Sequence, residues 1–249
     1  MLDSVGKANY NSLAIKLQER FNEGISYLIG YTWSKAIDTN SGIRGPNSDT
    51  LFPNNNNNVQ AERALAGFNT AHRLVGSGLY ELPFGQGKKF LNGGGISNVL
   101  LGGWQISSIV TIQSGNPMNV RVGGDQSNTG SFAGRMNATG QPTELPGGVR
   151  NTDRWFNTAA YALQPFGTFG NSGRNTVVLP GIMQWDFSTQ KTFRITEGQA
   201  IQFRFEAFNF PNHPNWGNPG FELLGSDFGV IRSTRTNMRE LQFGLKYVF

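Results

Sequence analysis

Cysteine is absent from this sequence, histidine is scarce and no apolar run is long. Without cysteine the chain can form neither a disulfide framework nor a cysteine-bound metal site. No apolar run approaches the roughly 18 residues that mark a membrane-spanning helix. The amino-terminal stretch MLDSVGKANYNS also lacks the apolar segment of a signal peptide. We therefore expect any exported precursor to begin upstream of Met1.

Aliphatic residues are few for a chain of 249 residues. Hydrophobic residues make up 37% of the chain and the mean hydropathy is -0.36, while there are 33 glycines and 19 phenylalanines. A large soluble core would need more aliphatic mass than this. A lipid-facing β-barrel can be polar overall, because half of each strand and the outer loops face water.

The excess of basic residues does not indicate a nucleic-acid-binding surface. The formal net charge is +5 and the isoelectric point is about 9.6. Lys and Arg are nevertheless scattered, and they form neither a long run nor a helical stripe. Because no recognised nucleic-acid-binding module is present either, we expect no nucleic-acid partner.

Residues that could carry catalysis or bind a metal are sparse. His72 and His213 are the only histidines, and no G-x-S-x-G nucleophile elbow accompanies them, so we expect no enzyme activity. The stretch 125–130 is similar to the first half of a calcium loop, but Met136 stands where the bidentate glutamate belongs. The stretch 85–89 lacks the spacing of a phosphate loop. We expect neither a metal ion nor a cofactor.

The carboxyl-terminal stretch MRELQFGLKYVF, residues 238–249, alternates between apolar and polar side chains. Such alternation is the pattern of a strand whose two faces meet different surroundings. In a soluble sandwich the apolar face would look into a core, whereas in an outer-membrane barrel it faces lipid and the polar face lines a wet interior. The apolar residues are Leu241, Phe243, Leu245, Tyr247 and Phe249.

Seven segments have this alternating pattern, and no segment has a convincing helical period. The first two segments are joined by a short turn and therefore predict a hairpin. The segments are Asn11 to Phe21, Ile25 to Ser34, Arg73 to Leu82, Gly103 to Ser114, Gln184 to Ile195, Ala200 to Phe210 and the terminus at 238–249.

The connections between these segments differ greatly in length. The first and the fifth are tight turns, at 22–24 and 196–199. The second, fourth and sixth span roughly 35, 70 and 25 residues, and the third is intermediate. Outer-membrane barrels alternate short periplasmic turns with long extracellular loops, whereas such loops are unusual in a compact soluble domain. The asparagine run 54–58 is expected to be a solvated loop.

The fold class predicted from these patterns is all-β, an antiparallel transmembrane β-barrel segment of about 7–8 meandering strands with long extracellular loops and short periplasmic turns. Seven is an odd number, whereas bacterial single-chain barrels close with an even one. We therefore expect residues 1–249 to be the carboxyl-terminal portion of a larger barrel. A small eight-stranded barrel, with one further strand within Gly170 to Leu179, is the alternative.

Charged and aromatic side chains can be assigned to places in such a barrel. Glu19 and Lys191 interrupt the apolar faces near short turns, where the membrane interface would lower the cost of a charge to about 0–1 kcal/mol. Charges on the polar faces would line the lumen, namely Arg204, Glu206, Glu240 and Lys246. Aromatic residues towards strand ends are expected to form girdles at the two interfaces, namely Tyr31, Trp33, Trp104, Trp185 and Tyr247.

Five stretches of the chain resemble the final strands of TonB-dependent outer-membrane receptors. The likeness is greatest to the Oar-like group, whose amino-terminal part carries a carboxypeptidase-regulatory-like domain. It extends from about Tyr10 to Phe249, and the ordered series of strand motifs is specific as a set. The stretches are YNSLAIKLQERFNEGISYLIGYTWSKAID, HRLVGSGLYELPFG, GWQISSIVTIQSGNPM, FRITEGQAIQFRFEAFNFPNHPNWGNP and FGVIRSTRTNMRELQFGLKYVF.

The resemblance implies a barrel of about 22 strands with an amino-terminal plug. Such receptors lie in the Gram-negative outer membrane and are driven by the TonB-ExbB-ExbD system. Implied partners are the lipid bilayer with its lipopolysaccharide, the plug and remaining strands of the parent receptor, TonB through that plug, and an unknown ligand. Neither a plug nor a TonB box is found within this sequence. The terminal aromatic Phe249, with the alternating residues before it, resembles the signal read by the barrel-assembly machinery.

Together these observations predict part of an outer-membrane transporter for an unknown ligand. Capture is expected in the loops Thr39 to Ala71, Asn116 to Ile182 and Asn212 to Asn237, followed by movement of the plug. One alternative is a structural or adhesive outer-membrane barrel without TonB coupling, and the other is a soluble carbohydrate-binding β-sandwich. Two packed layers with Phe205, Phe243 and Ile106 between them would favour the sandwich.

Overall fold

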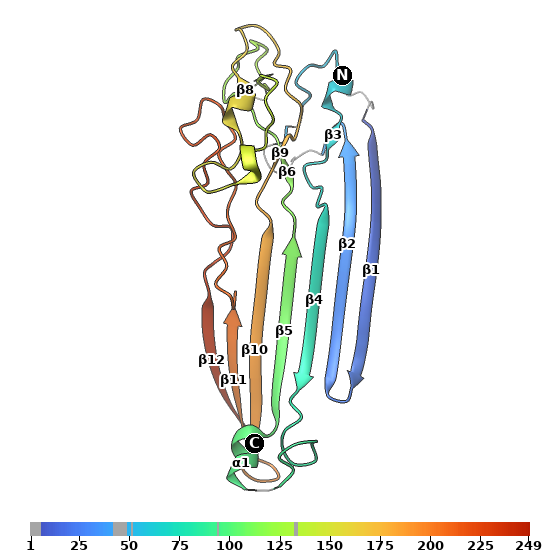
Figure 1. Cartoon of the computed structure of the whole chain (residues 1–249), viewed down its shortest axis with the longest axis vertical. Coiled ribbons are helices and arrows are strands. Elements are labelled where there is room, and N and C mark those ends of the chain that lie inside the picture. Colours follow the sequence, from blue (N-terminus) through green and yellow to red (C-terminus); the bar gives the residue numbers. More distant parts are fainter. Residues whose placement is uncertain (1–5, 42–48, 51, 94, 132–133) are drawn as a thin grey trace.

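The computed structural model describes residues 6–41, 49–50, 52–93, 95–131 and 134–249. Seven long strands lie side by side along the length of the molecule (Figure 1). They confirm the seven predicted strands, with ends that differ by a few residues. The long strands are β1 (Ala8–Asn22), β2 (Ile25–Asp38), β4 (His72–Glu81), β5 (Trp104–Gln113), β10 (Ile182–Arg194), β11 (Ala200–Phe208) and β12 (Glu240–Val248).

Each long strand pairs antiparallel with the next one along the chain, in the order β1-β2-β4-β5-β10-β11-β12. The turn between β1 and β2 places Glu23 at a φ of 49° and Gly24 at 88°. Two positive φ angles are what a two-residue hairpin needs for its twist to match that of the strands. β1 and β12 are the outer strands of this path and do not pair with each other, so the sheet is open over the described residues.

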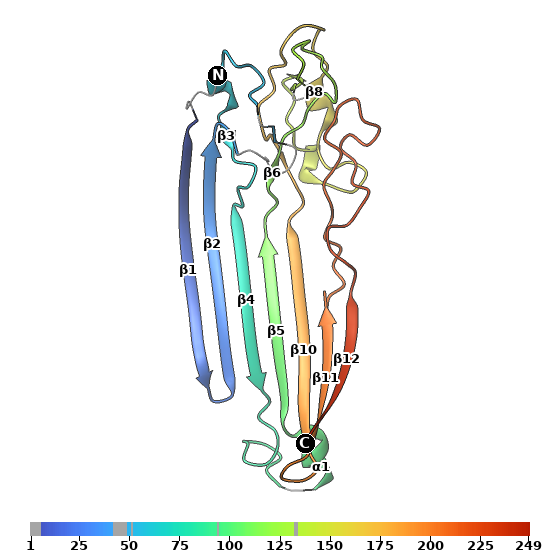
Figure 2. The same ribbon diagram turned by 180° about the vertical axis from the view of Figure 1, so that it is seen from behind.

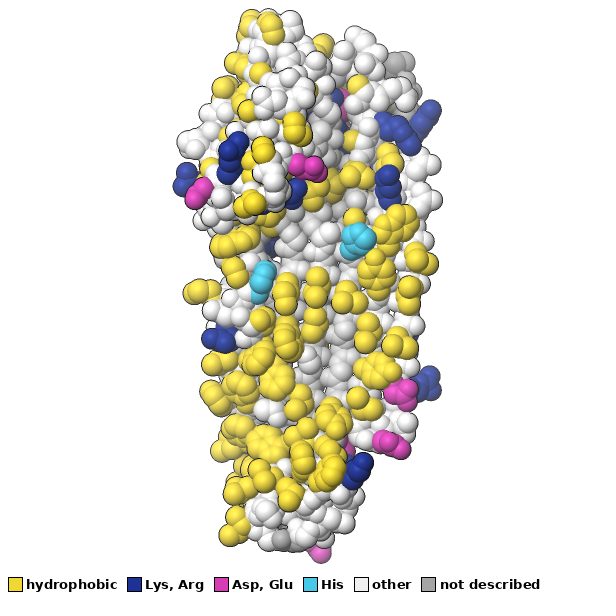
Figure 3. Space-filling view, in the orientation of Figure 1, with side chains coloured by type: hydrophobic (Ala, Val, Ile, Leu, Met, Phe, Trp, Pro, Cys, Tyr) yellow, Lys and Arg dark blue, Asp and Glu magenta, His cyan; other side chains and the backbone are white. Residues whose placement is uncertain are grey.

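The register of the sheet brings the apolar residues of all seven strands onto one face. Phe205 lies opposite Phe243, Thr189 opposite Ile106, and equivalent pairs continue across the sheet to β1. Apolar side chains cover this face in Figure 3 and are densest towards its lower end. The other two sheets among the described residues have two strands each, so no second large layer packs on this face.

Short and long connections lie at opposite ends of the sheet (Figures 1 and 2). The turns at 23–24 and 195–199 lie at the lower end, together with the carboxyl terminus and the segment that joins β4 to β5. The three long connections gather at the upper end. Their short elements are η1 (Val59–Glu62), β3 (Ala64–Leu65), β6 (Pro117–Met118), β7 (Asn137–Ala138), η2 (Pro146–Gly148), η3 (Thr158–Ala160), β8 (Tyr161–Ala162) and β9 (Val177–Val178).

Two sequence-based expectations about the elements are wrong. The segment between β4 and β5 contains a helix, α1 (Ile96–Leu101), although no helical period was recognised there. One turn and a half of helix is too short to show a period. The alternative strand within Gly170 to Leu179 is only β9, which pairs with β6 outside the large sheet. The additional member of that sheet is β3, which pairs with β2.

The hydrophobic core lies in the long connections and not against the sheet. Because one face of the sheet meets lipid in a barrel and the other meets water, the sheet itself needs no covering layer. In the connections, by contrast, apolar residues from distant positions pack against one another. The buried residues of this core are Met118, Val120, Val122, Met136, Phe156, Ala160, Tyr161, Val177 and Leu179.

Candidate functional site

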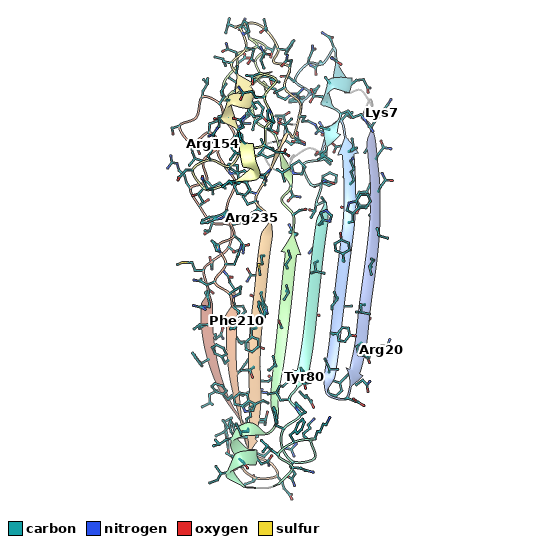
Figure 4. The ribbon with its side chains drawn as sticks, viewed as in Figure 1. Lys7, Arg20, Tyr80, Arg154, Phe210 and Arg235 are labelled. Atoms are coloured by element: carbon teal, nitrogen blue, oxygen red, sulfur yellow. The ribbon has the colours of Figure 1, made fainter. Side chains whose placement is uncertain are left out.

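The three long connections, residues 39–71, 114–181 and 209–239, fold together into one body that we call the cap. Figure 4 shows Arg154 and Arg235 in the cap, above the level of Tyr80 on β4. Backbone hydrogen bonds join the second connection to the third, since Arg121 N donates to Phe221 O and Leu223 N to Arg121 O, both at 2.9 Å. Residues 42–48, 51 and 132–133 of the predicted ligand loops lie outside the described residues.

A buried arginine joins the first two connections. Arg174 donates from Nη1 to Asp49 Oδ2 at 2.7 Å and from Nη2 to the Asp38 carboxylate. Its Nε donates to the Glu62 carbonyl oxygen at 2.9 Å. The side chains of Arg174, Asp38 and Asp49 are all at most 4% exposed. Buried charges remain ionised only when they are paired and hydrogen-bonded in this way, so the cluster holds the two connections in one arrangement.

A second buried ion pair reinforces the same junction. Arg135 donates to the two oxygens of the Glu62 carboxylate, at 2.5 and 3.0 Å. Its Nε donates to the Ser172 carbonyl oxygen at 2.8 Å. The fork-shaped guanidinium therefore bridges η1 and the second connection, with the two-pronged geometry that makes Arg–carboxylate pairs specific.

The asparagine run is anchored to this junction at its first residue. Asn54 N donates to Glu62 Oε1 at 2.9 Å, and Asn54 Nδ2 donates to Gly170 O at 3.0 Å. Arg135 N donates to Asn54 Oδ1 at 3.0 Å. The expected solvated loop is therefore correct only for the exposed stretch 56–58, because Asn54 is a structural link between two connections.

Beside this run lies a hollow of 360 Å³ in the cap. The two aromatic residues of its lining are well exposed, Phe52 at 64% and Phe169 at 42%. None of the described residues around it carries a formal charge. Amide and hydroxyl groups next to an aromatic face can hold an uncharged polar ligand by hydrogen bonding and stacking. The lining residues are Phe52, Pro53, Asn54, Asn55, Asn56, Asn57, Thr129, Gly130, Ser131 and Phe169.

The turn 125–130 lies next to this hollow, and the Asp125 carboxylate forms hydrogen bonds within the turn itself. Asp125 accepts hydrogen bonds from Thr129 N at 3.0 Å and from Gly130 N at 2.7 Å. The bond from Thr129 is the main cause that lowers the pKa of Asp125 below 3.8. The carboxylate thus closes a turn, and the described residues contain no group of three or more His, Asp or Glu that could hold a metal ion.

Tyr161 is the polar member of the cap core. Its hydroxyl lies 2.5 Å from the Thr176 hydroxyl, and its ring packs edge-on against Phe156 and Phe228 at 6.1 Å between centroids. Burial raises the pKa of the Tyr161 phenol above 10.0 because the phenolate would lose its hydration, although the bond to Thr176 partly opposes this.

Alkaline pH is expected to destabilise the cap through Tyr161. A raised pKa means that the contribution of the neutral phenol is complete below pH 10.0 and is lost as the pH rises through the folded-state pKa. Tyr161→Phe should lower the free energy of unfolding by about 0.5–1.5 kcal/mol at neutral pH. It should also reduce the loss of stability at alkaline pH. Thermal unfolding in detergent at several pH values measures both effects. Tyr10→Phe, at a well-exposed residue of β1, is the control. An unchanged alkaline loss in Tyr161→Phe would contradict the assignment.

The predicted terminal signal residues lie along β12 and just beyond it. Leu241, Phe243, Leu245 and Tyr247 share the apolar face and are each more than half exposed. Phe249 follows the last residue of the strand, and its ring stacks on Tyr247 at 5.8 Å. The structure therefore presents a regular, uncovered edge strand with an aromatic end, as the sequence pattern predicted.

The predicted girdle residues fall at two levels of the sheet. Trp104 begins β5 and Tyr247 nearly ends β12 at the lower level, whereas Trp185 and Trp33 lie at the upper level. Tyr31 lies in the middle of β2, and not near its end, because β2, like β1, continues beyond β4. Its partner Leu74 is close to the upper end of β4, so Tyr31 is level with the upper rim of the shorter strands.

The polar face carries the charged residues that were predicted to line the lumen, together with hydrogen bonds between side chains of neighbouring strands. Arg204 and Glu206 are 3.8 Å apart and partly exposed, so the pair is worth about 0–1 kcal/mol. Glu240 accepts from Asn237 Nδ2 at 2.8 Å, and Lys246 lies opposite Gln202. One such hydrogen bond between neighbouring strands joins Ser107 and Ser188, whose hydroxyl oxygens are 2.7 Å apart.

The comparison with known families decides what surrounds the apolar face. A family model described as an outer membrane beta barrel domain matches residues 1–242. The chain belongs to this family. No curated protein and no solved structure matches the chain. Among the described residues no helix is long and apolar enough to cross a membrane.

For an outer membrane beta barrel domain the two faces and two ends of the sheet can be assigned. The apolar face meets the lipid bilayer and the polar face lines the interior. The short turns and α1 belong to the periplasmic end and the cap to the extracellular end. Membership of the family points to the outer membrane of Gram-negative bacteria. The soluble sandwich gains no support, because Phe243 and Ile106 lie on an uncovered face.

Proposed function

We propose that this outer membrane barrel domain is the carboxyl-terminal part of a TonB-dependent, Oar-like receptor that takes up a ligand across the outer membrane. The observation that carries the proposal is the cap, in which three extracellular connections form one packed body with a hollow at its surface. The resemblance of the strand stretches to such receptors supports the same function.

The hollow in the cap is proposed as the place of capture. Because its lining has amide, hydroxyl and aromatic groups and no charge, it suits a neutral ligand rich in hydrogen-bonding groups. A highly charged ligand would lose hydration there without gaining an ion pair. Phe52 and Phe169 would stack on an apolar side of the ligand, while the asparagine amides hold its polar groups.

In this proposal the polar face contacts a plug and the open edges receive further strands. An unpaired strand edge in lipid leaves backbone groups unsatisfied, at a cost of several kcal/mol for each group. The edges of β1 and β12 would therefore pair with the remaining strands of a barrel of about 22. TonB would act on the plug, the barrel-assembly machinery on the terminal strand, and this chain would make or break no covalent bond.

Gene deletion tests the coupling to TonB. Cells that lack this protein, cells that lack TonB and cells that lack both are grown on a panel of neutral oligomeric nutrients. We expect the first two strains to lose growth on the same nutrient and the third to be no worse than either. Loss in the first strain with normal growth in the second would contradict TonB-dependent uptake.

A structural or adhesive barrel without TonB coupling is the second candidate. For this function, removal of the protein should reduce the attachment of cells to surfaces, while removal of TonB should not. The same set of strains distinguishes the two functions, because only uptake requires the energised inner membrane.

A further inference from the structure

Helix α1 exposes almost all of its apolar side chains. Ile96 is 79% exposed, and Val99, Leu100 and Leu101 are each more than half exposed. The helix has six residues and no side-chain cap at its start. Helices shorter than about 12–15 residues are marginal in water, and most helical stability comes from packing of an apolar face. The surroundings of α1 in the native protein must therefore include an apolar surface that the described residues do not supply.

The helix borders an apolar hollow of 560 Å³ at the periplasmic end of the sheet. Leu82 N donates to Trp104 O at 2.8 Å, and Thr189 pairs with Ile106. This register places Leu82, Trp104 and Thr189 on the lipid-facing side, so the hollow is continuous with the surface that meets the bilayer. The lining residues are Leu82, Phe84, Leu91, Leu100, Leu101, Trp104 and Thr189.

The walls of this hollow are held in place by hydrogen bonds. Trp104 Nε1 donates to Leu100 O at 2.9 Å, which ties the helix to the first residue of β5. Gln86 N donates to Asn98 Oδ1 at 2.9 Å, which ties the preceding turn to the helix. The backbones of Gly85 and Gly102 approach so closely that a Cβ on Gly102 would lie 2.8 Å from Gly85 Cα. The hollow is therefore built into the fold before anything binds.

Basic side chains lie next to residues that line the hollow or contact its lining. Lys88 is paired with Glu81 at 2.8 Å, and Lys191 donates to Gly102 O beside the Trp104 ring. Lys89 lies over the Phe90 ring, 5.6 Å from its centroid, and no ion pair within the described residues neutralises it. Lys88 is neutralised by Glu81 and Lys191 is only 4% exposed, so Lys89 is the basic side chain that can attract the phosphate of a lipid.

From this arrangement we infer that α1 and the hollow bind one glycerophospholipid of the periplasmic leaflet. An acyl chain occupies the hollow between the helix and the sheet, and the phosphate lies near Lys89. An apolar hollow stays dry, so an acyl chain satisfies it where water does not. The site also gives α1 the apolar surroundings that its side chains require. The inference depends on the barrel domain lying in a bilayer, and it does not depend on coupling to TonB.

Quenching of Trp104 by brominated lipid tests the site. The full chain is reconstituted in phosphatidylethanolamine vesicles that contain a small fraction of phosphatidylglycerol brominated on its acyl chains. The contribution of Trp104 is the difference between the wild-type chain and Trp104→Phe. We expect Trp104 to be quenched at lower brominated-lipid fractions than the remaining tryptophans. Lys89→Gln should raise the fraction needed about fivefold, from the ~1 kcal/mol attraction of one basic residue.

Two variants of α1 distinguish lipid binding in the hollow from a general effect of changing the helix. Leu100 lines the hollow, whereas Ile96 does not. Leu100→Gln should abolish the preferential quenching of Trp104, and Ile96→Gln should retain it. Quenching of Trp104 that only follows the bulk lipid composition, or that is equal in all variants, would overturn the inference. Protection of Trp104 from brominated lipid together with dimers in solution would show that a second copy covers the hollow, which also overturns it.

Discussion

Replacement of Arg174 by alanine is expected to destabilise the cap by about 3–5 kcal/mol, because it leaves the Asp38 and Asp49 carboxylates buried without their partner. The loss should separate the first long connection from the second and open the hollow beside them. Limited proteolysis of the reconstituted protein measures this opening as faster cleavage within the cap. The sheet should remain protected, since only the last residue of β2, Asp38, contacts the buried arginine.

A matched control is available in the same body. Arg121 and Glu222 form an ion pair at 2.6 Å, but both side chains are partly exposed. Arg121→Ala should therefore cost only about 0–1 kcal/mol and leave proteolysis nearly unchanged. If both arginine variants were cleaved at the same rate as the wild-type chain, the buried cluster would not hold the cap together.

Replacement of Phe243 by arginine is expected to reduce folding into bilayers by about 2–4 kcal/mol. Phe243 lies in the middle of β12, opposite Phe205, on the face assigned to lipid. An arginine there would place a charge among acyl chains, far from either interface. The fraction of protein that folds into vesicles and resists added protease measures the effect.

The neighbouring residue, Gln242, provides a matched test on the polar face. Gln242 lies opposite Glu206 on the polar face of the same strand. Gln242→Arg adds the same charge at nearly the same depth but towards the interior, and a carboxylate is close by. Its folding should stay near that of the wild-type chain. Equal losses in the two variants would show that the two faces of β12 do not meet different solvents.

The long strands could be predicted because their signal is local. Successive side chains of a strand point to opposite faces, so a strand between lipid and water must alternate. The stripe of β12, from Leu241 to Tyr247, satisfies this rule without reference to any other part of the chain. The same is true of the short turns, where Glu23 and Gly24 adopt the positive φ angles that a tight hairpin needs.

No local pattern in the sequence predicted the buried ion pairs of the cap. Arg174 and Asp38 are 136 positions apart, and Arg135 and Glu62 are 73 apart. Arg174, Arg135 and Glu62 stand in polar connections and Asp38 ends β2 where one begins, places where an exposed charge is the ordinary expectation. Only the folding of two loops against each other removes them from water. Nothing in the asparagine run showed that Asn54 would be a link between those loops.

Helix α1 was missed for a related reason. Its six residues are too few to reveal a period, and its preceding glycines are typical of a turn. The hydrogen bond from Trp104 to Leu100 and the close approach of Gly85 to Gly102 shape the segment. The first contact joins residues four positions apart, whereas Gly85 and Gly102 become neighbours only when β4 and β5 pair.

By itself the sequence determined the seven strands, their two-faced character and the alternation of short and long connections, because side-chain periodicity and turn chemistry act over a few residues. The tertiary structure alone decided that the connections form a cap with its own core, that Arg174 and Arg135 are buried within it, and that α1 lies beside an apolar hollow. These features depend on contacts between distant residues, whose energies arise only after the chain has brought them together.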